Sequence, residues 1–138
     1  MESTNHHGYR FLILAGIFGF LGVATGAFGA HALKDRLPED LLTIFNTGSR
    51  YCLEHAIALA MVSFAYIHTD QLWLRRACWG FTLGILIFSG SLWTLALTNT
   101  RWLGAITPLG GVGFLMGWLS IVFYALSPNS KQDGNPDS

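Results

Sequence analysis

The sequence predicts an all-α fold, a bundle of four helices that each cross a lipid bilayer. Two features of the composition favour a membrane protein: residues of the set AVILMFWYC make up 51% of the 138 residues, and charged residues only 12%. A soluble globular chain has about 25% charged residues, so this chain has too few charges to cover a water-facing surface. The third feature is that the apolar residues are gathered into long uncharged runs.

Three of these runs are long enough to cross a membrane, because a hydrocarbon core about 30 Å thick needs roughly 20 helical residues. They cover residues 11–30, 77–98 and 102–127. In lipid each backbone N–H and C=O must find a partner within its own segment or a neighbour, so the runs are expected to be helices. The sequence lacks the alternating stretches of about ten residues that are typical of membrane β-strands.

The first run admits a second interpretation, as a cleaved signal peptide. Arg10 precedes it, and residues 25–27 resemble a small-residue cleavage site. The apolar stretch is longer than the roughly 7 to 15 residues usual in a signal peptide. We therefore expect this run to be retained as the first span.

The second span is predicted at residues 51–67, where two polar residues precede an apolar stretch. In the connection before it, Pro38 is placed to begin a helix whose first turn carries Glu39 and Asp40, as is favoured at a helix N-terminus. Apolar residues follow on one side of this segment. We predict a short interfacial helix between the first and second spans; the alternative is a helix that runs on into the second span.

The sequence predicts a single four-span membrane domain over residues 9–127. Residues 1–8 are expected to be a flexible N-terminus. Residues 128–138 are rich in Pro, Asn, Asp and Ser and have nothing to bury, so they are expected to form a disordered tail.

Four spans place both termini on one side of the membrane, and the basic residues do not decide which side. Arg10, Arg75, Arg76 and Lys131 share the side of the termini, whereas Lys34, Arg36, Arg50 and Arg101 share the other. The positive-inside rule therefore gives a tie of four against four. We predict cytoplasmic termini, on the ground that Arg50 and Lys34 are engaged inside the bundle and do not bias insertion.

Small residues recur at helical spacing in three spans. No hydrophobic force joins helices that are already in lipid, so small residues that allow close contact take over that role. In the first span the glycines at 16, 19, 22, 26 and 29 are predicted to share one face. The residues predicted to pack at helix contacts are Gly22, Gly26, Gly80, Gly84, Ser89, Ser91, Gly113 and Gly117.

The fourth span contains a predicted break at the residues Thr107, Pro108, Gly110 and Gly111. Pro108 has no N–H to donate to the carbonyl of Gly104, and the glycines loosen the following turn. A kink or short unwound stretch is expected, either as a packing bend or as a flexible segment that lines a binding site.

The stretch RYCLEHA at residues 50–56 is the most polar part of the predicted spans. Four of its side chains fall within about 140° of arc on a helix at 100° per residue, and ionisable groups at membrane depth usually point into a bundle or a wet cavity. The candidate functional polar cluster is therefore Arg50, Tyr51, Glu54 and His55, with His31 and Lys34 expected nearby. In the alternative interpretation, Arg50 and Glu54 pair at the interface and only fix the end of the span.

Nothing in the sequence predicts catalysis, a metal site or a cofactor. HExxH and CxxC spacings are absent, and the basic residues are too scattered to predict nucleic-acid binding. Ser89 and Ser91 have no recognisable partner base, so they are expected to hydrogen-bond between helices. Cys52 and Cys78 are expected to lie toward opposite membrane faces as packing residues, without a disulfide between them.

Four motifs, GAFGAHALKDRL, TGSRYCLEHAIAL, FSGSLWTLAL and LGAITPLGGVGFLMGW, resemble in sequence and order the YgdD-like family of small bacterial inner-membrane proteins, which has animal relatives. The resemblance covers about residues 9–126 and implies the same four spans. It implies a location in the inner (plasma) membrane but no activity, because the family has a domain of unknown function. Glu54 departs from the neutral residue expected there in many members, so a shared Arg50–Glu54 pair is not implied.

Three hypotheses of function follow. The first is a non-enzymatic membrane protein whose small-residue faces support self-association or binding to a larger membrane complex. The second is a small carrier or channel for protons or a small solute, lined by the polar cluster and requiring an oligomer. The third, a membrane-embedded enzyme, has no nucleophile and base to support it. The expected partners are the lipid bilayer and either a second copy or a larger complex.

Overall fold

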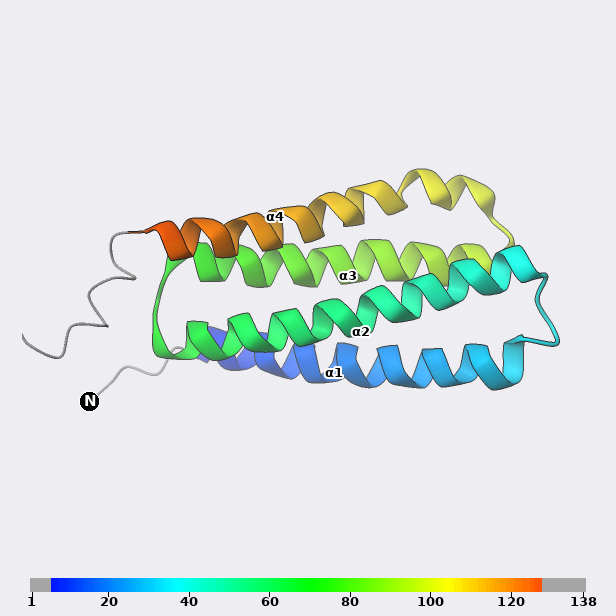
Figure 1. Cartoon of the computed structure of the whole chain (residues 1–138), viewed down its shortest axis with the longest axis horizontal. Helices are drawn as coiled ribbons and strands as arrows, with labels where there is room; N and C mark the ends of the chain where they lie inside the picture. The colour runs from blue at the N-terminus through cyan, green and yellow to red at the C-terminus, as the bar shows by residue number, and fades with distance from the viewer. Residues whose placement is uncertain (1–5, 128–138) are drawn as a thin grey trace, which may run out of the picture.

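The computed structural model describes residues 6–127, and within them the chain forms long antiparallel helices (Figure 1). The elements in order are α1 (His6–Phe28), η1 (Gly29–Leu33, a π-helix), α2 (Glu39–His68), α3 (Leu72–Thr98), η2 (Arg101–Ala105, a 3₁₀-helix) and α4 (Thr107–Leu126). With η1 extending α1 and η2 preceding α4, the described residues contain four helices long and apolar enough to cross a membrane. The predicted four-span architecture is confirmed.

The helices lie side by side in chain order, as Figure 1 shows. Each packs mainly on its neighbour in sequence, α1 on α2, α2 on α3 and α3 on α4, while α1 touches α3 only slightly. Short connections bring successive helices together as antiparallel neighbours. The arrangement is therefore an open row with α1 and α4 at its edges, rather than the compact bundle expected from the glycine pattern. Both ends of the described chain lie at the same end of the row.

The predicted short interfacial helix between the first and second spans is wrong for the described chain. Helix α2 begins at Glu39, directly after Pro38, and runs unbroken for 30 residues, so the alternative of continuation into the second span holds. The physical reason is that the apolar side of the segment is already buried within the protein. Phe45 packs in a small core with Leu33 and Ala96, which leaves no apolar face to lie on the membrane surface.

The first helix begins before residue 9, the predicted start of the membrane domain. Helix α1 begins at His6, so residues 6–8 of the expected flexible segment are helical. Gly8 is buried, and a Cβ there would lie 2.9 Å from the backbone nitrogen of Ile67, so the first turn of α1 is packed against the end of α2. The predictions for residues 1–5 and for the tail at 128–138 lie outside the described residues.

The predicted break in the fourth span exists, but it lies before Pro108 rather than after it. η2 ends at Ala105, and Pro108 occupies the first turn of α4, where a missing N–H costs no helical hydrogen bond. Gly110 and Gly111 lie in regular helix. At the junction the hydroxyls of Ser91 and Thr107 hydrogen-bond at 2.8 Å, which ties the start of α4 to α3.

Candidate functional site

The seam between α3 and α4 is closed by glycine, as predicted. A Cβ on Gly80 would lie 2.8 Å from the backbone nitrogen of Gly117, and one on Gly113 would lie 3.0 Å from the Cα of Gly84. Real Cβ atoms almost never come closer than 3.0 Å to backbone, so the approach at Gly80 requires glycine and the one at Gly113 lies at the limit. The backbones of the two helices are therefore in direct contact.

The two predicted serines hydrogen-bond between helices. Ser89 donates to the carbonyl of Gly48 on α2 at 2.8 Å, and Ser91 bonds the Thr107 hydroxyl on α4. A hydroxyl that is committed to a buried carbonyl is a structural group, because it has no base to activate it. Their role as helix-to-helix hydrogen-bonders is confirmed.

The seam between α1 and α2 is only partly closed. Gly22 is buried, and a Cβ there would lie 2.8 Å from the backbone nitrogen of Leu53, but around Gly16 and Gly26 nothing lies within 4 Å. The prediction that Gly22 and Gly26 form one contact is therefore half right. Gly26 lies instead in an open groove of about 580 Å³ between the two helices, with Ala30 and Arg50 also at its walls.

The predicted polar cluster is divided between two sides of α2. Tyr51 and His55 turn toward α3 and α4, where the His55 ring stacks on Phe114 with centroids 3.6 Å apart. His55 Nδ1 lies 2.9 Å from the carbonyl oxygen of Tyr51, and the Trp118 indole donates to His55 Nε2 at 3.3 Å. These bonds fit a neutral ring with its proton on Nδ1. His55 is thus a buried packing group with both nitrogens engaged.

Arg50 and Glu54 lie on the second side of α2. No helix of the described chain covers this side. Their side chains are 66% and 56% exposed, and Arg50 Nε lies 3.8 Å from Glu54 Oε1. The physical reason for the division is that α3 and α4 cover only the edge of the arc occupied by Tyr51 and His55. The arc deduced from sequence is correct, but it does not form one site.

His31 and Lys34 do not join the cluster. Both are exposed, His31 in η1 and Lys34 just after it. Within residues 6–127, neither side chain makes a hydrogen bond or ion pair with the polar residues of α2. No bond of the described residues supports the expected convergence of these side chains with the cluster.

The uncharged middle parts of the four spans together form a layer that we call the apolar zone. Charged residues lie at its two edges. At the end of the row that holds the termini, Arg10 lies two residues after Gly8, which packs on Ile67. Because α1 and α2 are antiparallel, Arg10 lies level with about position 65 of α2. Arg75 and Arg76, in the first turns of α3, lie at the same end. At the other end, Arg101 donates to the Asp40 carboxylate at 2.9 Å.

The Arg50–Glu54 pair lies at the centre of this zone. Halfway between the two charged levels is about position 52 of α2, and with a rise of about 1.5 Å per residue both side chains start within about 4 Å of that centre. A charged residue at the middle of a membrane helix costs about 2.5–3.5 kcal/mol on insertion scales. Depth and exposure together make this pair the strongest candidate site.

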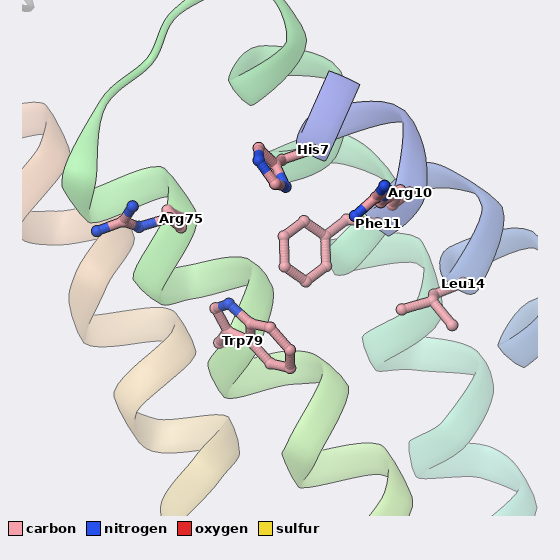
Figure 2. A pocket seen from close by; sticks show the side chains of 6 residues that line it. All are labelled: His7, Arg10, Phe11, Leu14, Arg75 and Trp79. Atoms are coloured by element: carbon pink, nitrogen blue, oxygen red, sulfur yellow. The ribbon is translucent and has the colours of Figure 1, made fainter. Parts of the chain in front are cut away.

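Sequence reasoning missed a hollow near the termini, between α1 and α3 (Figure 2). It has a volume of about 630 Å³, and Phe11 and Trp79 meet edge to face at its base, with centroids 5.3 Å apart. His7 and Arg10 lie at its rim, but the guanidinium of Arg75 points away from the hollow (Figure 2). The basic groups therefore do not converge on one ligand. The clustering of basic and aromatic residues at the ends of two spans was the sequence signal for it.

The described residues contain no group of three or more His, Cys, Asp or Glu side chains that could hold a metal ion. Cys52 and Cys78 are both buried and free. The Cys52 thiol donates to the carbonyl of Phe18 at 3.3 Å, and the Cys78 sulfur lies 3.8 Å from the Ser63 hydroxyl. The cysteines thus contribute to helix packing.

Comparisons with known proteins give the family. The family model described as "Protein of unknown function (DUF423)" matches residues 25–111. The UPF0382 membrane protein YwdK of Bacillus subtilis is 42% identical to this chain, over 84% of the chain and 95% of the relative. The UPF0382 inner membrane protein YgdD of Escherichia coli is 37% identical, over 87% of the chain and 92% of the relative.

A UPF0382 membrane protein of Haemophilus influenzae is 36% identical, over 88% of the chain and 97% of the relative. No solved structure matches the chain. Matches that cover 84–88% of the chain extend into all four spans, and the predicted location in the inner (plasma) membrane agrees with the name of the Escherichia coli relative. The chain is a multi-pass integral membrane protein that belongs to the DUF423 (UPF0382) family, a family of unknown function.

Proposed function

We propose that this protein is a non-enzymatic membrane component that acts by associating with another membrane protein surface through α2. The observation that carries the proposal is the exposed Arg50–Glu54 pair at the middle of the apolar zone. Left against hydrocarbon, two half-exposed charges are costly, so a second polar surface must cover them.

The surface involved is a continuous stripe on α2, which we call the α2 polar stripe. Its members are spaced three or four residues apart, so they lie on one side of the helix. All of them are exposed in the single chain. They are Thr43, Asn46, Arg50 and Glu54.

Small residues beside the stripe support the same proposal. The open groove next to Arg50 is lined by Gly22 and Gly26 of α1 and by Ala30 of η1. In membranes, such small side chains let another helix approach closely enough for van der Waals contact and hydrogen bonds. A polar stripe with an open small-residue groove beside it suits a helix-to-helix contact better than contact with lipid.

The contacts support association over transport or catalysis. A carrier lined by the whole predicted cluster would need His31 and His55 on one path, but His31 lies in η1 and His55 is held by two hydrogen bonds. Catalysis would need an activated nucleophile, whereas Ser89 donates to the carbonyl of Gly48 and Ser91 to the carbonyl of Phe88, and neither carbonyl is a base.

The proposal is tested by the size of the particle in native nanodiscs. We expect the wild type to run as a complex larger than one chain, and Arg50→Glu to run as a single chain, because two neighbouring acids would repel a partner surface matched to Arg50. Arg36→Glu, a charge change in the exposed connection, is the control and should leave the complex intact. A wild type that runs only as a lone monomer would contradict the proposal.

A further inference from the structure

We propose that the surface covering the α2 polar stripe is the same stripe of a second copy inserted in the opposite orientation, so that the protein is an antiparallel homodimer. This inference rests on the proposed association and adds the identity and direction of the partner. It is carried by where the two charges lie relative to the centre of the membrane.

The charge pair is self-complementary under one symmetry operation. Arg50 and Glu54 are equally spaced about position 52 of α2, and position 52 is also the centre of the apolar zone to within about one residue. A two-fold axis that lies in the membrane midplane and crosses α2 there exchanges the level of Arg50 with that of Glu54. Each arginine then meets the glutamate of the other copy.

A parallel pair gives the opposite result. A two-fold axis along the membrane normal keeps every residue at its own depth, so Arg50 faces Arg50 and Glu54 faces Glu54. Like charges opposed in a medium of low dielectric constant repel each other strongly. The charge arrangement on the stripe therefore favours the antiparallel pair over the parallel one.

The distribution of basic residues permits both orientations. Because Arg50 lies at mid-depth, it does not count as a charge of either face, and the remaining basic residues divide four against three. The four are Arg10, Arg75, Arg76 and Lys131, and the three are Lys34, Arg36 and Arg101. The positive-inside rule sets orientation through an excess of Lys and Arg on one face, and one residue is a very weak excess. The predicted cytoplasmic termini then describe half of the copies.

The first test asks whether the pairing occurs between chains. Two differently tagged copies are expressed together in a bacterial membrane and purified in mild detergent. With Arg50→Glu on both copies, or Glu54→Arg on both, we expect loss of co-purification, because every facing pair has like charge. With Arg50→Glu on one copy and Glu54→Arg on the other, co-purification should return to the wild-type level.

Recovery in the mixed pair also shows that each variant folds. If the ion pair acted only within its own chain, mixing the variants would restore nothing, and the proposal would be overturned. Self-association of either single variant at the wild-type level would overturn it as well.

The second test fixes the direction of the partner. Thr43 and Met61 are both exposed on the same side of α2, and both lie nine residues from position 52. Within one chain they are about 27 Å apart along the helix, too far for a short bifunctional thiol reagent. In the antiparallel dimer, Thr43→Cys on one copy cross-links with Met61→Cys on the other, while two copies of Thr43→Cys do not. The parent with its two buried cysteines is the control.

Cross-links between two copies of Thr43→Cys, without cross-links between Thr43→Cys and Met61→Cys, would overturn the antiparallel arrangement and leave the proposed association intact. If the wild type showed no self-association, both the proposed association and the antiparallel arrangement would be contradicted. Insertion in both orientations is tested separately with two reporters fused after Ser138. One reporter is active only in the cytoplasm and the other only in the periplasm, and we expect signal from both. Signal from one reporter alone would overturn insertion in both orientations.

Discussion

The α3–α4 seam and the α1–α2 seam both carry glycines at helical spacing, yet the first is closed by its glycines and the second is closed at Gly22 and at Gly29 of η1 but open at Gly26 between them. On α3, Gly80 and Gly84 lie directly against the backbone of α4. On α1, Gly26 borders an open groove next to Arg50. The same sequence signal therefore marks a contact made within the chain in one place and a free surface in the other.

This difference shows that small residues at helical spacing do not by themselves say whether a helix face is buried within the chain. The positions of the neighbouring helices decide it. The closed seam joins two helices linked by a tight connection, with the C-terminal Asn99 of α3 in a left-handed conformation (φ 54°). The open groove lies beside the only charged pair that the described chain places at mid-depth. Polar and small residues together indicate a contact surface left over for another chain.

The largest expected effect is at the closed seam. Gly84→Leu places a side chain against Phe114 and 3.1 Å or less from the carbonyl oxygen of Gly110, so α3 and α4 must separate. We expect a loss of about 3 kcal/mol or more in the free energy of unfolding, measured by SDS-induced unfolding in mixed micelles. Gly90→Leu, at an open position of the same helix, is the matched control. Equal stability of the two variants would contradict the closed seam.

A smaller effect is expected for the polar link between α2 and α3. Ser89→Ala removes the donor to the carbonyl of Gly48, and hydrogen bonds of this kind in membrane proteins are worth about 0.6 kcal/mol on average, up to about 1.7. We expect a destabilisation of about 1 kcal/mol in the same unfolding assay. Thr94→Ala is the control, because Thr94 is exposed and bonds only within its own helix, to Gly90. A larger loss for Thr94→Ala would show that Ser89 does not link the helices.

The smallest effect is expected at the open groove. Gly26→Leu adds a side chain where nothing lies within 4 Å, so the free energy of unfolding of the single chain should change by less than about 0.5 kcal/mol. Gly22→Leu, one turn away on the same side of α1, places its side chain against the backbone of Leu53 and should destabilise far more. The two variants are compared at a detergent dilution at which particle size shows the protein to be a single chain. Similar losses for both would mean that the groove is closed in the native protein.

The residues of the polar cluster could be predicted from the sequence. Their separation into a buried pair and an exposed pair could not. The spacing of Arg50, Tyr51, Glu54 and His55 places them on one arc of α2 by helix geometry alone. Whether a position on that arc is buried depends on where α3 and α4 lie. Those helices cover His55 and leave Arg50 exposed, although both belong to the same short motif. Within the described chain, His31 makes no hydrogen bond or ion pair with the cluster for a related reason: η1 continues α1, and its Gly29 packs on Phe45 and Asn46, about one turn of α2 before Arg50.

The sequence by itself determined that the chain crosses the membrane four times and where each span lies, because the length of an uncharged run and the cost of an unpaired backbone group in lipid are local properties. Only the tertiary structure decided that residues 39–50 continue α2, that the break of the fourth span lies before Pro108, and which charges stay uncovered. These outcomes depend on which neighbouring helix occupies each side of a span. Contacts between residues far apart in the chain set that arrangement, and a pattern within one helix does not contain it.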